Sequence, residues 1–401
     1  MPSLEKPQAL DWRLTIGFAF SMFTVGAFFL LLSPALHEIS FSLSAPQHLL
    51  GLPSALYGLS LGASALGVSA ILDRFDRRGF FYSGVIGHAA GVAMISVAPS
   101  WAWFSFGWVL CGAGAGLMQP SAYAILSDAT NDKTRAKSLG RVNVGWACAT
   151  LIGVPAGAAL LDAFGWRLSL SLFLLIWTGV CALTGWYLLT RPKSQFKPAD
   201  LPVLWSQERL DAIVSHRLHW LFLATILIFI GFYGVYTFLG VAIFDRLGLS
   251  PSAIGIFVGI YGAGFLVGTL NTSLVDRLGY VRTLILAATG LTLILTLAPH
   301  TLINSISIAA FMFIWGIFQV AAFTSLTSIA GSAPKDLRGL ALALNSAAVM
   351  IGASLGAASM SYIFSQFGFA VVGLLCGTAT LVAVAIAWCR IRPSPRATFS
   401  T

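Results

Sequence analysis

Charged residues are scarce in this sequence. Asp, Glu, Lys and Arg make up 9% of its 401 residues, and hydrophobic residues make up 57%, whereas about 25% charged residues are usual in a soluble domain. A water-soluble surface around so large a core needs far more charge, so the composition excludes an ordinary soluble enzyme and a disordered chain. Five cysteines, none in a CxxC pair, also exclude a disulfide scaffold and are expected to be reduced packing residues.

Signatures of enzyme chemistry are missing as well. The apolar segments contain no HExxH motif, no GxSxG motif, and no pair of carboxylates or metal ligands on one helix. The net charge of +9 lies in short basic runs between long apolar stretches, not on one face of a soluble domain, which argues against a nucleic-acid partner. We therefore expect no catalytic residue, metal or cofactor.

What the sequence does contain is a series of long apolar runs. A membrane helix needs about 20 mostly apolar residues, and the many Gly, Ala and Ser residues in these runs favour close helix packing. The predicted fold class is an all-α polytopic membrane protein with twelve transmembrane helices. The expected spans are 14–36, 49–72, 79–98, 101–127, 138–161, 168–190, 218–243, 252–275, 281–298, 302–330, 339–364 and 369–389.

The positions of the basic residues predict the orientation in the membrane. An even number of spans places both termini on one side, and all but two of the 23 basic residues then lie on that side. Only Arg167 and Arg246 lie on the other. Because basic residues collect in cytoplasmic loops, both termini are predicted in the cytoplasm, with an uncleaved first span, in a plasma membrane of the bacterial inner-membrane type.

Two halves of the chain resemble each other at a constant offset. The longest polar stretch, 191–217, is expected to be a cytoplasmic linker between two six-helix halves, 1–190 and 218–401. A parallel repeat of this kind is typical of secondary transporters, whose substrate site lies between the halves near the membrane midplane. The positions that recur 203 residues later are Asp73 as Asp276, Arg135 as Arg338, Gly153 as Gly356, and Phe164-Gly165 as Phe367-Gly368.

The loop after the second span carries a motif that is repeated after the eighth. The first copy reads Ser69-Ala-Ile-Leu-Asp73-Arg74-Phe75-Asp76-Arg77-Arg78, and the second reads Thr272-Ser-Leu-Val-Asp276-Arg277-Leu278-Gly279. Both resemble the signature of the major facilitator superfamily, G-x-x-x-D-R-x-G-R-R. In the first copy Ser69 and Asp76 replace the glycines; Asp76 is expected to keep the turn, because Asp tolerates left-handed backbone better than most residues.

The resemblance implies a latch that holds one transport state. By analogy, Asp73 would face the start of span eleven near Arg338, since a carboxylate is stabilised near a helix N-terminus. Arg74 or Arg77 would pair with Asp128 at the end of span four. The alternative is a solvated loop that only sets topology. The remaining latch residues that the motif implies are Arg78, Asp276 and Arg277.

Span five contains a Gly-x-Pro-x-Gly motif, formed by Gly153, Pro155 and Gly157 and followed by a Gly-Trp-Arg sequence. It is similar to the span-five motif of the twelve-span drug:proton antiporter and sugar-efflux group, which implies export. Its small residues are expected to pack against span eight, or simply to serve generic helix packing. The arginine and glutamine that this group carries in span four are replaced by Trp108 and Cys111. The glycines expected to face the motif are Gly262, Gly264 and Gly268.

Proton coupling usually requires a group inside the membrane that changes its charge, yet every acid lies in a loop, a tail or a span end. His88, inside span three, is one candidate, because its unperturbed pKa of about 6.5 suits proton exchange. His37 and Glu38, at the outer end of span one, form a second candidate pair. A packed core histidine and an interfacial helix end are the alternatives, and uniport or another coupling ion stays open.

Polar and aromatic side chains near the midplane predict the substrate cavity. In the fold that the resemblance implies, spans one, four, seven and ten line this cavity. The candidates carry no charge and suit a neutral or amphipathic solute, since a dianion or dication would find no fixed counter-charge. They are Tyr57, Gln119, Tyr123, Tyr233, Tyr236, Tyr261, Trp315, Gln319 and Asn345.

These observations favour a monomeric carrier in the lipid bilayer that exports a small drug or metabolite by alternating access, with protons as a candidate coupling ion. Import or uniport of a small metabolite is an alternative, because direction depends on gradients and not on the fold. A carrier-like receptor or scaffold without transport is another, given the altered first loop and the missing arginine of span four. A resemblance at the level of the fold does not identify the solute.

Overall fold

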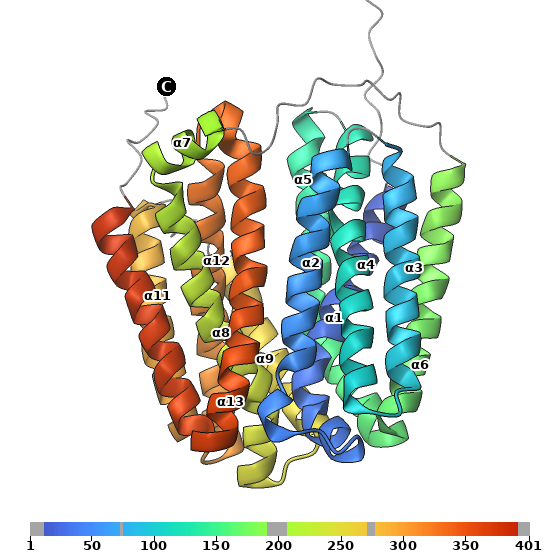
Figure 1. The fold of residues 1–401 in the computed structure, drawn as a ribbon, viewed down its shortest axis with the longest axis vertical. Helices are drawn as coiled ribbons and strands as arrows, with labels where there is room; N and C mark the ends of the chain where they lie inside the picture. Colours follow the sequence, from blue (N-terminus) through green and yellow to red (C-terminus); the bar gives the residue numbers. More distant parts are fainter. Residues whose placement is uncertain (1–11, 73–74, 131, 191–206, 271–276, 392–401) are drawn as a thin grey trace, which may run out of the picture. The chain divides into compact units, whose positions relative to one another are not determined.

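The computed structural model describes residues 12–72, 75–130, 132–190, 207–270 and 277–391, and within these ranges the chain is helical without a β-strand. Long apolar segments form helices because only a helix satisfies the backbone hydrogen bonds of a single segment inside a bilayer. Figure 1 traces these helices along the chain. The all-α polytopic class expected from the sequence is therefore confirmed.

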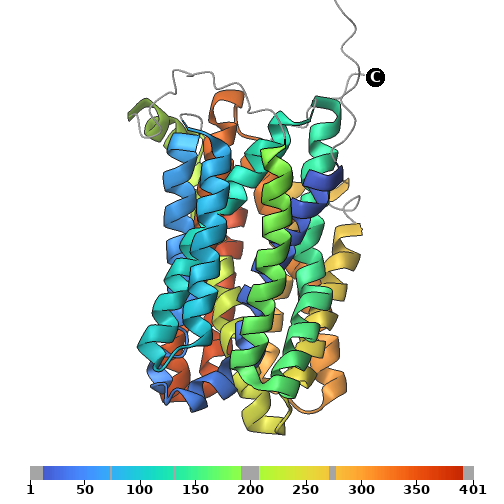
Figure 2. The ribbon, with the colours of Figure 1, turned by 90° about the vertical axis from the view of Figure 1, so that its right-hand side faces the viewer.

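Six α-helices, the short 3-10 helix η1 (Gln47–Leu49) and one π-helical turn precede residue 191 in the part of the chain that the structure describes. The helix α4 packs against α2 and α3, while α1 packs against α5 and α6. Figure 2 shows α3 and α6 running side by side. The segments are α1 (Trp12–Ser42), α2 (Leu52–Ile71), α3 (Arg77–Ser96), α4 (Trp101–Asp128), α5 (Asp132–Cys148), the π-helical turn η3 (Ala149–Gly153) and α6 (Val154–Leu189).

Six helices follow. The helix α11 packs against both α12 and α13, and the short α7, which lies inside the stretch expected to be a linker, packs against α13. The helices are α7 (Gln207–Ser215), α8 (Leu218–Leu247), α9 (Pro251–Leu270), α11 (Tyr280–Thr301), α12 (Ser305–Gly331) and α13 (Lys335–Arg390).

By packing, the chain divides into two compact units. The first comprises residues 1–200 and 239–262, and the second comprises 201–238 and 263–401. The end of α8 and the start of α9, joined by a turn at Gly248 (φ 63°), thus belong with the first unit. We call residues 239–262 the α8–α9 hairpin. The predicted halves, 1–190 and 218–401, remain a prediction.

The number of membrane spans depends on whether two very long helical segments are each one span or two, and one glycine in each segment decides this. Ten helical segments of the described residues are long and apolar enough to cross a membrane. Two of them, Gly140–Leu189 and Leu337–Arg390, are far longer than one crossing needs. Each contains one glycine with non-helical backbone angles, Gly165 (φ 71°) or Gly368 (φ 75°), which divides it into two spans. Divided at these glycines, the ten segments give twelve lengths of described chain that each suit one crossing by length and composition.

The internal repeat is visible in the structure. The two glycine turns, Gly165 and Gly368, lie 203 residues apart, and α11 begins at Tyr280, 203 residues after α3 begins at Arg77. Most residues avoid positive φ. A left-handed glycine at two matching positions is therefore a backbone feature that a similar pattern of apolar residues would not by itself produce. The same backbone geometry therefore recurs along with the sequence.

The start of α3 differs from expectation. Asp76 is extended (φ −64°, ψ 113°), and its side chain accepts a hydrogen bond from the backbone N–H of Arg78 at 3.0 Å. The expectation that Asp76 uses left-handed backbone was wrong, since the residue acts as an N-cap, a role for which Asp is well suited. Gly279, the equivalent position before α11, does have positive φ (85°). The two copies of the loop thus enter their helices in different ways.

Candidate functional site

An ion pair joins α3 to α4 at one end of the first unit. The guanidinium of Arg77, the first residue of α3, pairs with the carboxylate of Asp128, the last residue of α4, and also lies 3.4 Å from the Ala124 carbonyl oxygen. Its residues match one of the two pairings that the signature loop implies, and its function as a latch stays a prediction. Asp73, Arg74 and Asp276 lie outside the described residues, and Arg277 and Arg338 are exposed.

The glycines of the span-five motif face α1. A Cβ on Gly153 would lie 2.7 Å from that of Ala27, and one on Gly157 would lie 2.9 Å from Leu31 Cδ2. Close packing on α1 requires glycine at position 153, because the Ala27 Cβ cannot rotate away, whereas at position 157 the end of the Leu31 side chain could shift to admit a Cβ. Pro155 is the second residue of α6, which begins directly after η3; proline lacks an N–H donor and disturbs the helix ladder, which accounts for the π-helical turn before it.

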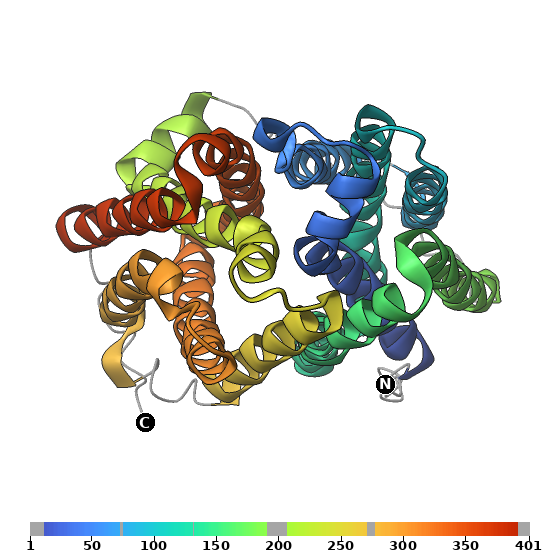
Figure 3. The same cartoon turned by 90° about the horizontal axis from the view of Figure 1, so that it is seen from below.

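Pro155 itself faces the glycines of α9. A Cβ on Gly259 would lie 2.8 Å from Pro155 Cγ, and a Cβ on Gly262 would lie 2.7 Å from the Leu151 nitrogen. Figure 3 shows α9 (yellow) beside α6 (green). Of the span-five motif, Pro155 packs on the expected helix, α9, but the expectation was wrong for Gly153 and Gly157, which face α1. It was also wrong for Gly264 and Gly268, which pack on Phe313 and Val320 of α12.

A dense set of polar contacts surrounds the Gly165 turn. The indole Nε1 of Trp166 donates to Ser42 Oγ at 2.9 Å, and Arg167 Nη2 donates to the Ala98 carbonyl oxygen, at the end of α3, at 3.0 Å. The Glu38 carboxylate accepts a hydrogen bond from the backbone N–H of Trp166. These contacts tie the turn to α1 and α3.

Asp162, the second carboxylate near the Gly165 turn, caps the start of α9. Asp162 Oδ2 accepts hydrogen bonds from the backbone N–H of Ser252 at 3.1 Å and from its hydroxyl. Asp162 lies close enough to Glu38 for their charges to interact, as does His37. The His37 ring is stacked on Phe244 with centroids 3.6 Å apart. The candidate pair His37 and Glu38 therefore lies beside a contact that the sequence analysis missed; the Ser-Pro-Ser start of α9 was its available signal, because it marks a helix N-terminus.

His88 is fully buried in the first unit. Its Nδ1 lies 3.0 Å from the Cys111 carbonyl oxygen, and its ring packs against Phe28 and Trp177. A carbonyl only accepts hydrogen bonds, so Nδ1 carries the proton and Nε2 is the free basic atom, without a partner among the described residues. A role for His88 in proton exchange stays a prediction.

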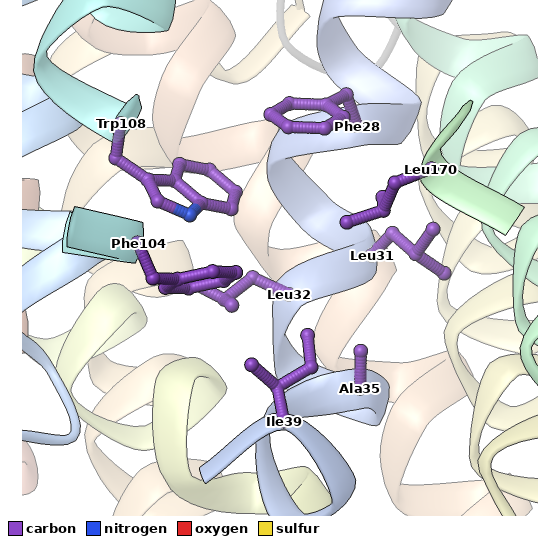
Figure 4. A pocket seen from close by; sticks show the side chains of 8 residues that line it. All are labelled: Phe28, Leu31, Leu32, Ala35, Ile39, Phe104, Trp108 and Leu170. Atoms are coloured by element: carbon purple, nitrogen blue, oxygen red, sulfur yellow. The ribbon is translucent and has the colours of Figure 1, made fainter. Parts of the chain in front are cut away.

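Trp108 stands where the antiporter group carries its arginine. Its ring stacks on Phe28 at 4.9 Å and meets Tyr57 edge-on at 5.7 Å. Figure 4 shows a small pocket beside it, with Phe104 and Trp108 of α4 on one side and Leu170 of α6 on the other. The side chains that line this pocket are apolar. At the position where the antiporter group carries a charged arginine, this chain therefore presents the aromatic surface of Trp108. The lining residues are Phe28, Leu31, Leu32, Ala35, Ile39, Phe104, Trp108 and Leu170.

Aromatic residues of α8 and α12 cluster in the second unit. Phe232 stacks on Tyr236 at 5.5 Å and contacts Tyr233 at 4.8 Å and Trp315 at 5.2 Å. Gln319 lies one turn beyond Trp315 and is 3% exposed. Neither its amide nitrogen nor its amide oxygen has a hydrogen-bond partner among the described residues. The cluster thus combines aromatic rings, which include two buried tyrosine hydroxyls, with a buried amide that both donates and accepts.

Other cavity candidates hold helices together. Asn345 Oδ1 accepts a hydrogen bond from the Thr225 hydroxyl at 2.8 Å, which links α13 to α8 in a buried position. The Tyr123 hydroxyl donates to Asn143 Oδ1 at 2.6 Å. Gln119, half-buried, has an amide nitrogen without a partner in the described part of the chain. Among the described residues, no group of three or more His, Cys, Asp or Glu is placed to hold a metal ion.

Known proteins resemble this chain over nearly its full length. The family model of the Major Facilitator Superfamily matches residues 15–333 and 221–401. An uncharacterized MFS-type transporter of Bacillus subtilis, YwfA, is 27% identical over 378 residues, covering 94% of this chain and 90% of that protein. A probable sugar efflux transporter of Mannheimia succiniciproducens is 25% identical over 365 residues, covering 88% and 87%.

The fold is also similar to a solved structure, the crystal structure of a D-xylose-proton symporter. The two superpose with a TM-score of 0.77 at 17% sequence identity, covering 96% of this chain and 99% of the other. At this identity the likeness concerns the fold, and the neighbour's substrate and coupling remain properties of that protein.

Proposed function

Because the chain belongs to the Major Facilitator Superfamily and is a membrane transporter, we propose that it exports a small neutral or amphipathic solute by alternating access. Two features support export. One is the span-five motif, which is similar to that of the drug and sugar efflux group, and the other is the relative described as a probable sugar efflux transporter. In the proposed orientation both termini lie in the cytoplasm of a cell with a bacterial-type inner membrane, and the carrier works as a monomer.

The observation that carries the solute class is the buried Gln319 amide beside the aromatic cluster of α8 and α12. A buried amide without a partner costs about 1–3 kcal/mol for each unsatisfied atom. A solute that presents a neighbouring donor and acceptor, such as a hydroxyl-bearing or amide-bearing molecule, recovers this free energy, while its apolar part packs on Phe232, Tyr236 and Trp315. A fixed ionic charge on the solute would find no counter-charge in the cluster.

Energy coupling in the proposed mechanism rests on three titratable candidates, His88, His37 and Glu38. His88 has a free Nε2 that accepts one proton, but this atom is enclosed by packed aromatic rings. Glu38 and His37 lie at a helix end, beside Asp162. We favour the pair over His88 because a coupling group has to exchange its proton with water during the cycle.

The test is a thermal-shift screen of the purified protein with neutral sugars, neutral aromatic amides, amino acids and lipophilic cations at two pH values, followed by flux in proteoliposomes. We expect stabilisation by a neutral class and its loss in Gln319→Leu. Gln366→Leu is the matched control, because Gln366 is exposed. Stabilisation by lipophilic cations alone, or equal binding by Gln319→Leu, would contradict the proposed solute class.

A further inference from the structure

In each unit an arginine lies over an aromatic ring of a neighbouring helix. The guanidinium carbon of Arg13, near the start of α1, lies 5.6 Å from the ring centroid of Tyr187, near the end of α6, and 5.4 Å from that of Trp12. In the second unit the guanidinium carbon of Arg390, the last residue of α13, lies 5.1 Å from the ring centroid of Trp220, near the start of α8. These distances are within the range of cation–π contact. We call the two contacts the first corner and the second corner.

Each corner joins the first and the last membrane helix of its own unit. Further along α1, a Cβ on Gly17 would lie 2.5 Å from Thr184 Oγ1 of α6. Further along α8, a Cβ on Gly231 would likewise lie 2.5 Å from Thr380 Oγ1, in the part of α13 after Gly368. Glycine therefore brings the two helices close together in both units, and this close packing fixes the spacing of the helices that carry each corner.

The two corners are related by the internal repeat, with the cation and the ring exchanged. Arg390 follows Tyr187 by the offset of the repeat (390 − 187 = 203), and Trp220 follows Arg13 by one helical turn more (220 − 13 = 207). In the first corner the arginine is on the first helix of the unit and the ring is on the last, whereas the second corner has the reverse arrangement. What recurs is therefore the pairing of an arginine with a ring, and not one residue type at one position.

The helix dipole does not account for this pairing. A cation is favourable at the end of a helix, where Arg390 lies, but unfavourable at the start of a helix, where Arg13 lies. Both arginines are exposed, and among the described residues neither has a carboxylate partner. A ring contacts the flat face of a guanidinium and leaves the N–H groups at its edge, whose fork matches two oxygens of a phosphate. Each corner thus holds an oriented arginine that can bind an oxyanion.

Exposed apolar side chains adjoin both corners. Trp186 and Leu189 of α6 flank Tyr187, and Leu223 of α8 and Trp388 of α13 lie within one turn of Trp220 and Arg390. Tryptophan is enriched where a membrane helix meets the interface between lipid and water. A free phosphate ion gains nothing from apolar neighbours, whereas the acyl chains of a phospholipid pack against them. The combination of an oxyanion site with an apolar surface therefore favours a lipid as the occupant.

We propose that the two corners bind the phosphate groups of anionic phospholipids, with one site in each unit. The arginine binds the phosphate, the ring orients the arginine, and the acyl chains lie along the exposed apolar side chains. Because a corner joins the first and last helices of its unit, a bound lipid stabilises the packing of that unit. In the orientation predicted from the basic residues, both corners lie at the cytoplasmic leaflet, whose surface is negatively charged. Lipid binding at the corners is independent of the transported solute.

The test counts the lipids that the detergent-purified protein retains in native mass spectrometry. The probes are phosphatidylglycerol and, for comparison, phosphatidylcholine with the same acyl chains. We expect two phosphatidylglycerol molecules to bind in preference to phosphatidylcholine. Arg13→Gln and Arg390→Gln should each weaken one of the two about fivefold, and the double variant should weaken both. Tyr187→Leu and Trp220→Leu, which keep the arginines, should weaken the same lipids by a smaller factor because only the orientation is lost.

The matched control is Arg282→Gln, because Arg282 is an exposed arginine at the start of α11, on the same predicted side of the membrane. Its lipid titration should equal that of the parent. If a glutamine variant does not fold, Arg13→Lys or Arg390→Lys replaces it, and its binding should also weaken because lysine keeps the charge without the fork. An equal loss in Arg282→Gln, unchanged binding in the ring variants, equal binding of phosphatidylcholine, or displacement of the lipid by inorganic phosphate overturns the proposal.

Discussion

The packing of α3 on α4 allows a sharp prediction about stability. The two helices approach backbone to backbone at Gly84, where an added Cβ would lie 2.6 Å from the Gly114 carbonyl oxygen and 2.7 Å from the Met118 nitrogen. Ordinary van der Waals contact begins at 3.4 Å, so Gly84→Ala forces a separation of 3.4 − 2.6 = 0.8 Å. The obstructing atoms belong to a helix backbone and cannot rotate away.

The neighbouring Gly87 provides the matched control. A Cβ there would find Gly114 Cα at 3.5 Å as its nearest atom, which is ordinary contact. Overpacking a close interface costs about 1–3 kcal/mol, whereas alanine is a better helix former than glycine by about 1 kcal/mol. We expect Gly84→Ala to be destabilised and Gly87→Ala to be unchanged or slightly more stable.

The assay is thermal unfolding of the detergent-purified protein, followed by the loss of the monodisperse peak in size-exclusion chromatography. Both variants gain the same helix propensity, so the overpacking cost of about 1–3 kcal/mol, at about 2–4 °C for each kcal/mol, should make Gly84→Ala melt about 2–12 °C below Gly87→Ala and at or below the parent. Gly91→Ala should behave like Gly84→Ala, since its Cβ would lie 2.6 Å from the Cys111 nitrogen. Equal melting temperatures for Gly84→Ala and Gly87→Ala would refute the reasoning.

Three further predictions concern polar contacts. Asp76→Ala removes the N-cap of α3 and should cost about 1 kcal/mol in thermal unfolding, while Asp76→Gly should cost only a few tenths; equal costs would argue against capping. Asp128→Asn breaks the pair with Arg77, whose side chains are 25% and 38% exposed, so stability should change by less than about 1 kcal/mol while flux in proteoliposomes falls; unchanged flux would count against a latch. Asn345→Leu removes one hydrogen bond between α8 and α13, while the Thr225 hydroxyl keeps the Leu221 carbonyl oxygen as an acceptor at 3.0 Å, so the variant should cost about 0.5–1.5 kcal/mol in thermal unfolding; an unchanged melting temperature would count against this link.

Much of the fold could be predicted from the sequence because a bilayer leaves few choices. Long apolar runs must become helices, and the offset of 203 residues predicted a repeat that the glycine turns at Gly165 and Gly368 share. The π-helical turn before Pro155 was not predicted, because a proline disturbs a helix in several ways and the sequence does not select among them.

The prediction that Gly262, Gly264 and Gly268 of α9 all face the span-five motif was wrong for two of the three glycines. Gly262 and Gly264 are two positions apart, which is about 200° around a helix, so they cannot face the same neighbour. Gly255, Gly259 and Gly262 follow the i, i+4, i+7 spacing of one face; the first two contact α6, and Gly262 contacts the η3 turn directly before it. The spacing of the glycines was therefore enough to predict which of them share a face. The hydrogen bond between Asp162 and Ser252 could not be predicted in this way, because it joins positions 90 residues apart and depends on how the helices are arranged.

The glycine turns at Gly165 and Gly368 also bear on how the protein is made. Each joins two membrane-crossing helices through one residue of non-helical backbone, so no loop separates the pair. We expect the two helices of each pair to enter the bilayer together during synthesis, because neither can take up an orientation independent of the other. An insertion directly after Gly165 would therefore disturb biogenesis more than one of equal length in the polar stretch 191–206, and the fraction of chains that reach the membrane would report the difference.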